Sequence, residues 1–377
     1  MDFDLSPQQR RRADHIRTGA GKLPPTGPDG IAGRDCWLAA AELGMTGLCL
    51  PTEYGGGGLG ALDTALCLEA FCAGGADTGL AFGIAAHLLA CGTVLTDHAG
   101  DPVRAELLHG LSSGTMIAAN AMTEEDAGSD LSRLATTAVA DGDHYVLNGR
   151  KSFVSNAPLA DVFLTYAATT PSAGYLGMSV FAVPRTLPGL RVGAPLAKTG
   201  LDGCAAAQVE FTGCEVPARY LLGPENQGSG VFQRSMIWER ACLPALYLGV
   251  MEVQLDRCVA HAKHRRQFGR SIGTFQAVSH RLATMKLRLE SSRLLLYRAC
   301  WDIDQGHAAA AESAALAKTA VADAAVANAL DAVRVFGARG YLADDGIGRQ
   351  LQDATPLHIF SGTTEIQREV IARSLGL

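Results

Sequence analysis

Segments with the composition of β-strands are confined to one central stretch of this chain, and this confinement constrains its fold more than any other feature. Between about residue 114 and residue 225, short runs of β-branched and aromatic residues alternate with Gly, Pro and Asp. Outside that stretch, apolar residues recur at helical spacing, as in Val278, Leu282, Met285 and Leu289. The pattern predicts a helical domain, a compact antiparallel sheet or barrel, and a helical bundle, in that order.

Turn residues set the predicted bounds of individual elements. Four consecutive glycines at 55–58 cannot continue a helix, so they separate two helices of the first domain. Asn148-Gly149 predicts a tight hairpin turn after a strand that begins at His144, with the returning strand at 151–155. Further strands are predicted at 161–166, 178–183 and 207–211. The predicted domains are residues 1–113, 114–225 and 226–377.

Composition argues against several classes of function. With 48% apolar and 19% charged residues, the 377-residue chain can bury a large core and is not a disordered protein. Its net charge is −6, it has no basic stripe, and only 6% of its residues are aromatic. These properties do not suit a surface that neutralises phosphates and stacks on bases, so we expect no nucleic-acid partner.

Cysteine spacing and charge distribution indicate the compartment. The ten cysteines form no CxxC pair, so we expect no metal site and no disulfide framework, but the reduced thiols of a cytoplasmic protein. The charged N-terminus lacks the apolar core of an export signal. The uncharged segment 78–96 is long enough to span a membrane, but it contains glycines and has no basic anchor. We therefore expect a buried core helix there and no membrane partner.

Two segments contain groups that could bind phosphate. Residues 123–130 (TEEDAGSD) combine two hydroxyls with Gly128, which would let backbone N–H groups approach an anion. The same composition is also common in plain turns. Residues 261–270 concentrate basic side chains around one aromatic residue, and Arg265 and Arg266 could donate to a phosphate. The alternative is a solvated helix end.

Two further segments could carry a base or a helix-terminal site. Glu239 and Arg240 begin a run that is otherwise free of charge. Burial there would raise the pKa of the carboxyl group, as a general base requires, although a simple ion pair would use the same residues. Residues 359–368 (IFSGTTEIQR) place a Ser/Thr-Gly loop before a terminal helix, which could contact an anion or a ribose or could simply cap the helix.

Taken together and in this order, the four segments resemble the flavin-dependent acyl-CoA dehydrogenase family over nearly the whole chain. Residues 123–130 stand where that family has TEPxAGSD, and residues 151–156 (KSFVSN) are similar to its K-x-[WF]-[IV]-[TS]-N strand. Residues 265–276 match its RxxFG…I…FQ segment, residues 335–340 its [IV]-[FY]-G-G-x-G, and the C-terminal segment its IYEGTxxIQ. The resemblance implies an α+β multi-layer fold: an N-terminal α-helical domain, a middle antiparallel β-barrel domain and a C-terminal four-helix bundle.

The resemblance also implies FAD as the cofactor, bound at the β domain. The implied FAD contacts are Met122, Thr123, Gly128, Ser129, Phe153, Ser155, Arg265, Gln267, Phe268, Gln276, Arg334, Gly337, Thr363 and Glu365. Arg265, Gln267 and Gln276 would reach the FAD of a neighbouring subunit, which implies a homo-oligomer, a dimer or a dimer of dimers. The family usually has Gln where this chain has Glu365, so this contact departs from the family pattern.

One departure from the family pattern decides the expected mechanism. The usual catalytic Glu of YEGT is replaced by Ser361, and a hydroxyl is not a base near neutral pH, so we expect Ser361→Ala to keep most activity. In a minority of the family, including isovaleryl-type enzymes, the base comes from a helix that starts with a Glu-Arg pair, and Glu239-Arg240 stands at that place. The resemblance therefore implies Glu239 as the catalytic base, with Arg240 and Ser129 near the substrate.

A closer resemblance, to the L-prolyl carrier-protein dehydrogenases, rests on residues 238–243, 275–283, 285–291, 298–301 and 359–363. It implies FAD-dependent α,β-dehydrogenation of a prolyl group on a carrier protein to a pyrrole-2-carboxyl thioester, as in natural-product biosynthesis. An electron-transfer flavoprotein or oxygen would be the re-oxidant. Three alternatives stay open: a dehydrogenase of a short or branched acyl-CoA or acyl-carrier-protein thioester, a flavin-dependent hydroxylase, and a non-catalytic scaffold.

Overall fold

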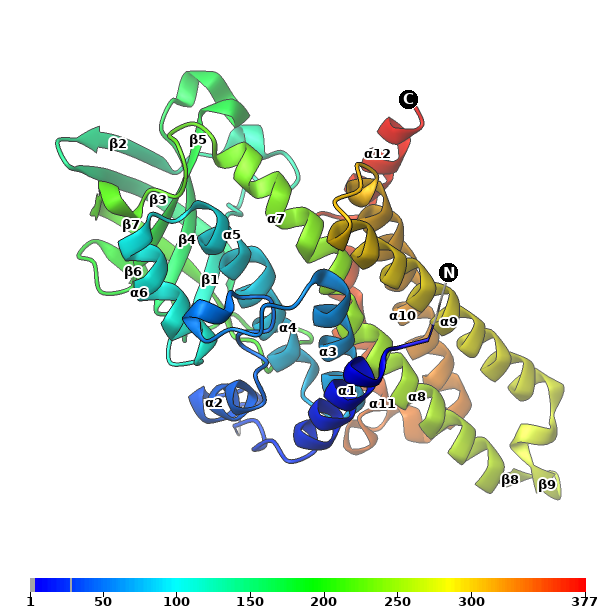
Figure 1. Cartoon of the computed structure of the whole chain (residues 1–377). Coiled ribbons are helices and arrows are strands. Elements are labelled where there is room, and N and C mark those ends of the chain that lie inside the picture. The colour runs from blue at the N-terminus through cyan, green and yellow to red at the C-terminus, as the bar shows by residue number, and fades with distance from the viewer. Residues whose placement is uncertain (1–3, 28) are drawn as a thin grey trace.

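The computed structural model of this chain describes residues 4–27 and 29–377. Helices come first, strands follow, and helices return, as the sequence predicts. Figure 1 shows the strands of the middle part gathered at one end of the molecule. The long helices α8 (Ala245–His264), α9 (Gln276–Asp304) and α10 (Ala310–Phe336) extend toward the other end, and the N-terminal helices pack between them.

The N-terminal part is helical and contains one long apolar helix. Its elements are α1 (Pro7–Ala20), α2 (Arg34–Glu42), η1 (Thr52–Tyr54), α3 (Ala61–Ala73), α4 (Thr78–Ala86), the π-helical η2 (His87–Gly92), α5 (Thr93–His98) and α6 (Asp101–Ser112). The side chain of Asp77 caps α4 by accepting from the Leu80 N–H at 2.9 Å. Within the described residues, one helix, Thr78–His98, is long and apolar enough to cross a membrane, and 78% of its apolar window is buried inside the molecule.

The middle part is a seven-stranded sheet with short 3₁₀ connections. Its elements are β1 (Ala118–Ala121), η3 (Leu131–Arg133), β2 (Thr137–Asp141), β3 (His144–Ser155), β4 (Val162–Ala168), η4 (Pro171–Gly177), β5 (Met178–Pro184), β6 (Leu190–Val192), β7 (Ala206–Pro217) and η5 (Ala218–Tyr220). The strand order is β1-β4-β2-β3-β7-β6, with β5 on the other edge of β4. The expected domain boundaries after residues 113 and 225 fall in the connections before β1 and after η5.

The sheet is mixed, whereas the sequence predicted a purely antiparallel one. β1 and β2 both run parallel to β4, with Ala118 opposite Val162 and Thr137 opposite Ala168, while the other pairings are antiparallel. Every residue of β4 is buried. Continuous burial is typical of a strand that is covered on both faces, as strands with parallel neighbours usually are, and the apolar run at 162–168 carries that signal.

The predicted turn at Asn148-Gly149 is wrong. Both residues lie inside β3, which runs unbroken past them, and the chain reverses earlier, at Gly142 with φ 61°. A register shift in the β3–β7 pairing between Leu147 and Gly149 accommodates the glycine as a bulge. Because Tyr145 and Leu147 continue the buried face of the sheet, burial overrides the local turn signal.

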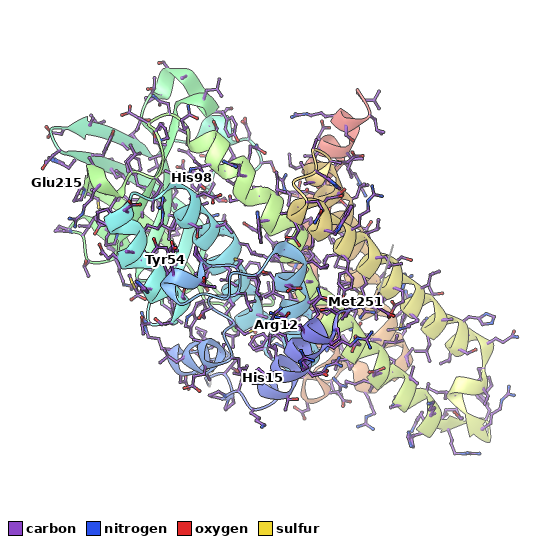
Figure 2. All side chains as sticks on the ribbon, in the orientation of Figure 1. Arg12, His15, Tyr54, His98, Glu215 and Met251 are labelled. Carbon is purple, nitrogen blue, oxygen red and sulfur yellow. The ribbon has the colours of Figure 1, made fainter. Side chains whose placement is uncertain are left out.

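The C-terminal part is a bundle of long helices. Its elements are α7 (Gly228–Cys242), α8 (Ala245–His264), β8 (Arg266–Gln267), β9 (Arg270–Ser271), η6 (Ile272–Thr274), α9 (Gln276–Asp304), α10 (Ala310–Phe336), η7 (Gly337–Tyr341), η8 (Ala343–Asp345), α11 (Ile347–Ala354), η9 (Thr355–His358) and α12 (Thr364–Ser374). Alanines of α10 let its neighbours approach closely. Figure 2 labels Met251 on α8, whose sulfur lies 3.5 Å from Asn328 Nδ2 in the bundle core. The β8–β9 pair is a small hairpin that the sequence did not predict.

Candidate active site

Glu239 is buried and lies in the last turn of α7, whereas the sequence analysis placed the Glu239-Arg240 pair at the start of a helix. The helix begins earlier, at Gly228, and ends at Cys242. Its Oε1 accepts a hydrogen bond from the Ser361 hydroxyl, and its Oε2 has no hydrogen-bond partner within the described residues. Burial raises the pKa of the Glu239 carboxyl group, against the opposing effects of the Ser361 hydrogen bond and the positive charges of Arg240 and Lys318. A carboxylate with one free oxygen and a raised pKa suits a general base near neutral pH.

The loop that carries Ser361 is held by donors from three helices. Arg240 Nε of α7 donates to the Ser361 carbonyl at 3.0 Å, Lys318 Nζ of α10 donates to the Gly362 carbonyl at 2.6 Å, and Gln367 Nε2 of α12 donates to the same Gly362 carbonyl at 2.9 Å. All three side chains are buried. The loop is therefore fixed at its backbone, independently of what the Ser361 side chain does.

The sequence analysis missed Lys318. It is fully buried, and burial lowers the pKa of its amine to about 8, helped by the neighbouring Arg240 and opposed by Glu239 and Glu365. A signal was present: Lys318 stands alone among the alanines and valines of 314–322, where a charged residue needs a buried partner.

A first cavity, of about 380 Å³, opens between the β domain and the C-terminal segment. Phe153 and Ser155 of β3 line one wall, Phe360 and Ile359 line another, and the loop 196–201 lines a third. Phe82 of α4 also contributes, with its ring 4.8 Å from that of Phe360. Phe153 is 64% exposed and has φ 58°, next to a register shift in β3. The bulge thus holds an aromatic ring uncovered on the cavity wall.

A second cavity, of about 320 Å³, brings together the two predicted substrate contacts, Ser129 and Arg240. Tyr175 and Phe232 line it, as does the outer face of α12. Ser361 links the two cavities, because its neighbour Phe360 lines the first cavity and its partner Arg240 lines the second. Glu239 lines neither cavity, but it is hydrogen-bonded to Ser361 and directly precedes Arg240, so it adjoins this link.

The loop after β1 is anchored by a buried ion pair. Lys151 Nζ donates to Glu124 Oε1 at 2.7 Å and to the Met122 carbonyl at 3.0 Å. The carboxylate of Glu124 also accepts from the N–H groups of Ala135 and Thr136. Burial lowers the pKa of Lys151 to about 8, although Glu124 opposes the shift. The sequence identified this segment as a motif but did not identify Lys151 and Glu124 as its anchor.

This anchor holds the remaining motif residues beside β3. The Ser152 N–H donates to the Thr123 carbonyl at 2.8 Å, which places Met122 and Thr123 next to the strand of Phe153 and Ser155. Gly128 is exposed, and a Cβ added to it would meet no atom within 4 Å. At the other end of the site, Thr363 caps α12 by accepting from the Ile366 N–H at 3.3 Å, while the neighbouring Glu365 is exposed.

The remaining predicted cofactor contacts lie at the far tip of the bundle. Figure 1 shows the β8–β9 hairpin at the end of α8 and α9 that points away from the sheet. The exposed residues of this group are Arg265, Gln267, Phe268, Gln276, Arg334 and Gly337. The ring of Phe268 is 92% exposed. None of the six lines either cavity, so a single chain does not bring them to the site around Glu239.

Three family models cover the chain in succession. The N-terminal domain of acyl-CoA dehydrogenase matches residues 26–115, the middle domain matches residues 119–214, and the C-terminal domain matches residues 226–376. The chain belongs to the acyl-CoA dehydrogenase family. The membership and the helix–sheet–helix fold class predicted from the sequence are thereby confirmed, and the acyl-CoA dehydrogenase fold carries the site around Glu239.

Three individual proteins of this fold are similar to the chain over nearly its whole length. An L-prolyl-[peptidyl-carrier protein] dehydrogenase of Pseudomonas fluorescens is 49% identical over 383 residues, which span 100% of both chains. The solved structure of PigA with FAD and proline has a TM-score of 0.97 at 41% identity and covers 100% of both chains. The prolyl acyl carrier protein oxidase AnaB has a TM-score of 0.96 at 36% identity, covering 99% of this chain and 100% of AnaB.

Proposed function

We propose that this chain is an FAD-dependent dehydrogenase that oxidises an L-prolyl group, held as a thioester on a carrier protein, to a pyrrole-2-carboxyl group. The observation that carries the proposal is the buried Glu239 carboxylate, which has an unpartnered oxygen and whose neighbours Arg240 and Phe360 line two separate cavities. Relatives that share 49% and 44% of their residues with this chain are prolyl carrier-protein dehydrogenases, which supports the prolyl group as the substrate.

The residues of the first cavity fit FAD. The uncovered ring of Phe153 and the ring of Phe360 offer flat apolar surface to a flat ring system, and a volume of about 380 Å³ falls in the range of small-molecule sites. Phe153 and Ser155 would hold the ring end, and Thr363 at the start of α12 would lie toward the adenosine end. When bound, FAD supplies a two-electron acceptor for the hydride that leaves the substrate β-carbon, which no side chain can supply.

Glu239 removes the α-proton of the acyl group. The thioester carbonyl acidifies this hydrogen, and the proton moves to the free Oε2 of Glu239 while Oε1 stays bonded to Ser361. Burial raises the proton affinity of the carboxyl group, so that it can take a weakly acidic proton near neutral pH. Two successive oxidations remove four hydrogens from the pyrrolidine ring and leave a pyrrole.

The second cavity receives the arm that carries the acyl group. Ser129 offers a hydroxyl to the arm. The Nε of the buried Arg240 donates to the Ser361 carbonyl, so the other N–H groups of its guanidinium are available to an amide or carbonyl of the arm. Tyr175 and Phe232 supply apolar contact for the methylene groups. The cavity thus suits an extended chain of alternating amide and methylene groups, such as a phosphopantetheine arm.

The partners follow from the same arrangement. The protein forms a homo-oligomer, a dimer or a dimer of dimers, in which Arg265, Gln267 and Gln276 of one subunit contact the FAD of its neighbour. An electron-transfer flavoprotein or oxygen restores the oxidised cofactor. The enzyme works in the cytoplasm, where its ten free thiols stay reduced.

The test is mass spectrometry of a prolyl-loaded carrier protein after incubation with the purified yellow enzyme. We expect the tethered group to lose four mass units. A gain of one oxygen atom would indicate a hydroxylase, and protein that purifies without flavin would indicate a scaffold. Faster turnover of isovaleryl-CoA than of the prolyl carrier protein would instead assign the enzyme to branched acyl-CoA substrates.

A further inference from the structure

We propose that Ser361 is a positioning residue, whose hydroxyl holds Oε1 of Glu239 so that Oε2 alone faces the substrate, and that Lys318 maintains this arrangement by fixing the backbone of the Ser361 loop. The proposal rests on the proposed function, since it takes Glu239 as the base. It assigns a role to the residue that replaces the family's usual carboxylate and to a buried lysine that the mechanism leaves unused.

The backbone at Ser361 shows that its position is imposed by its surroundings. Its φ is 56°, in the left-handed region that side chains rarely adopt, and Gly362 follows with φ 87°. A residue held in this region is stable only where neighbouring groups fix it. The conformation turns the Ser361 carbonyl toward Arg240 and leaves its hydroxyl on Glu239.

Lys318 is one of the groups that fix it. Its amine is fully buried and donates to the Gly362 carbonyl, directly after Ser361. An amine donates this hydrogen bond in both protonation states, so the contact survives the titration of Lys318. Together with Arg240 and Gln367, Lys318 gives the carbonyls of 361–362 donors on three sides.

The hydroxyl has two consequences for Glu239. The hydroxyl donates to Oε1, so the Glu239 side chain cannot turn freely. Only Oε2 is then free to take the reacting hydrogen. It also stabilises the ionised carboxylate, in the same direction as the charges of Arg240 on α7 and Lys318 on α10. The groups facing Glu239 from the other packed elements are Cys91 of η2 and Tyr166 of β4, and burial raises the pKa of both so that they stay neutral.

The test separates the base from its positioning residue. The enzyme is reduced anaerobically, so that it cannot accept a hydride, and is given L-prolyl-S-pantetheine in deuterated buffer between pH 5 and 9. Mass spectrometry then measures the uptake of one deuterium at the α-carbon. Because the reduced enzyme cannot accept a hydride, this uptake reports proton removal alone. Ser361→Gly deletes the hydroxyl and suits the left-handed backbone, Ser361→Ala deletes it with backbone strain, and Thr319→Ala is the matched hydroxyl deletion on α10.

We expect both Ser361 variants to exchange about tenfold more slowly than wild type at pH 6, with the acid limb of the profile moved up by about one pH unit, and to approach the wild-type rate at pH 9. The expectation from the sequence that Ser361→Ala keeps most activity is thereby limited to the alkaline part of the profile. Flavin content and KM should stay unchanged, and Thr319→Ala should match wild type. Lys318→Met should move the acid limb of the exchange profile in the same direction, and Lys318→Arg should return it part of the way to its wild-type position.

Two outcomes separate this inference from the proposed function. If Glu239→Gln abolishes exchange but the Ser361→Gly profile coincides with that of wild type, the positioning role is wrong and the base assignment stands. The same holds if only Ser361→Ala is slow, since backbone strain would then explain the loss. If Glu239→Gln still exchanges at the wild-type rate, the proposed base itself is wrong.

Discussion

The site around Glu239 and the tip of the β8–β9 hairpin both match sequence motifs of the family, but a single chain completes only the first. Glu239 is buried and reached by side chains of α7, α10 and the Ser361 loop. At the hairpin, Arg265, Gln267 and Phe268 are exposed, and the centroid of the Phe268 ring lies 6.1 Å from that of Phe275. A motif whose reactive groups are exposed on an otherwise well-packed chain indicates a partner that the chain does not contain.

The contrast also shows where each region should be sensitive to substitution. A change at the buried site should alter chemistry while leaving cofactor and assembly intact. A change at the hairpin should alter cofactor retention or assembly while leaving the surroundings of Glu239 intact. The following predictions test this separation.

The largest effect is expected for Glu239→Gln, which keeps the size and the hydrogen bond of the side chain but removes the basic oxygen. Loss of a general base typically lowers the rate by about 10²–10⁴. Flavin bleaching in an anaerobic single turnover should slow by at least the lower factor, with FAD still bound. Glu312→Gln, in the first turn of α10, is the matched control. Bleaching at the wild-type rate would make Glu239 a structural residue only.

An intermediate effect is expected for Arg265→Ala at the hairpin. Loss of a charge-assisted contact to a pyrophosphate costs about 1.5–3 kcal/mol, so FAD occupancy should fall tenfold or more. Flavin absorbance per protein after dialysis, together with the mass in solution, measures this. Lys263→Ala removes a positive charge from the end of the same α8 helix and should retain FAD. Equal occupancy in both variants and an unchanged oligomer would remove Arg265 from the cofactor site.

The smallest effect is expected in the pH dependence of stability at Lys318. Its pKa in the folded protein is about 8, below its ordinary value of 10.5, so between these values the unfolded chain binds more protons. Stability from this group therefore rises with pH from about 8 to 10.5, by at most about 3 kcal/mol. Urea denaturation of wild type and Lys318→Met at pH 7 and pH 10 checks the sign. The wild-type advantage should be larger at pH 10, and a smaller one there would contradict the buried amine.

Sequence reasoning recovers what depends on local pattern and ordered motifs. The order of helices and strands was predictable, and the two residues predicted as substrate contacts, Ser129 and Arg240, line one cavity. The match of Phe153 and Ser155 to a motif also placed both on one strand, and the structure puts them on one cavity wall.

What the sequence did not predict depends on contacts between distant segments. Lys318 and Gly362 are separated by α10 and α11, and their hydrogen bond exists only because the bundle brings these segments together. Asn148-Gly149 has the composition of a turn, but the burial of Tyr145 and Leu147, which precede it in β3, outweighs this local signal. The parallel pairing of β1 with β4 likewise joins distant segments. The apolar run of β4 indicates burial on both faces, but it does not identify β1 as the partner strand.

The mixed sheet has a consequence for the order in which the chain assembles. β4 and β5 meet through the short η4 connection, and β2 and β3 meet at Gly142, so both hairpins can close locally and fast. β1, by contrast, is synthesised well before β4 and has no strand partner until β4 leaves the ribosome. We therefore expect β1, and with it the loop beginning at Met122, to join the sheet only once β4 has been made, so that until then the newly made chain depends on its N-terminal helices to shield Ala118–Ala121 from aggregation.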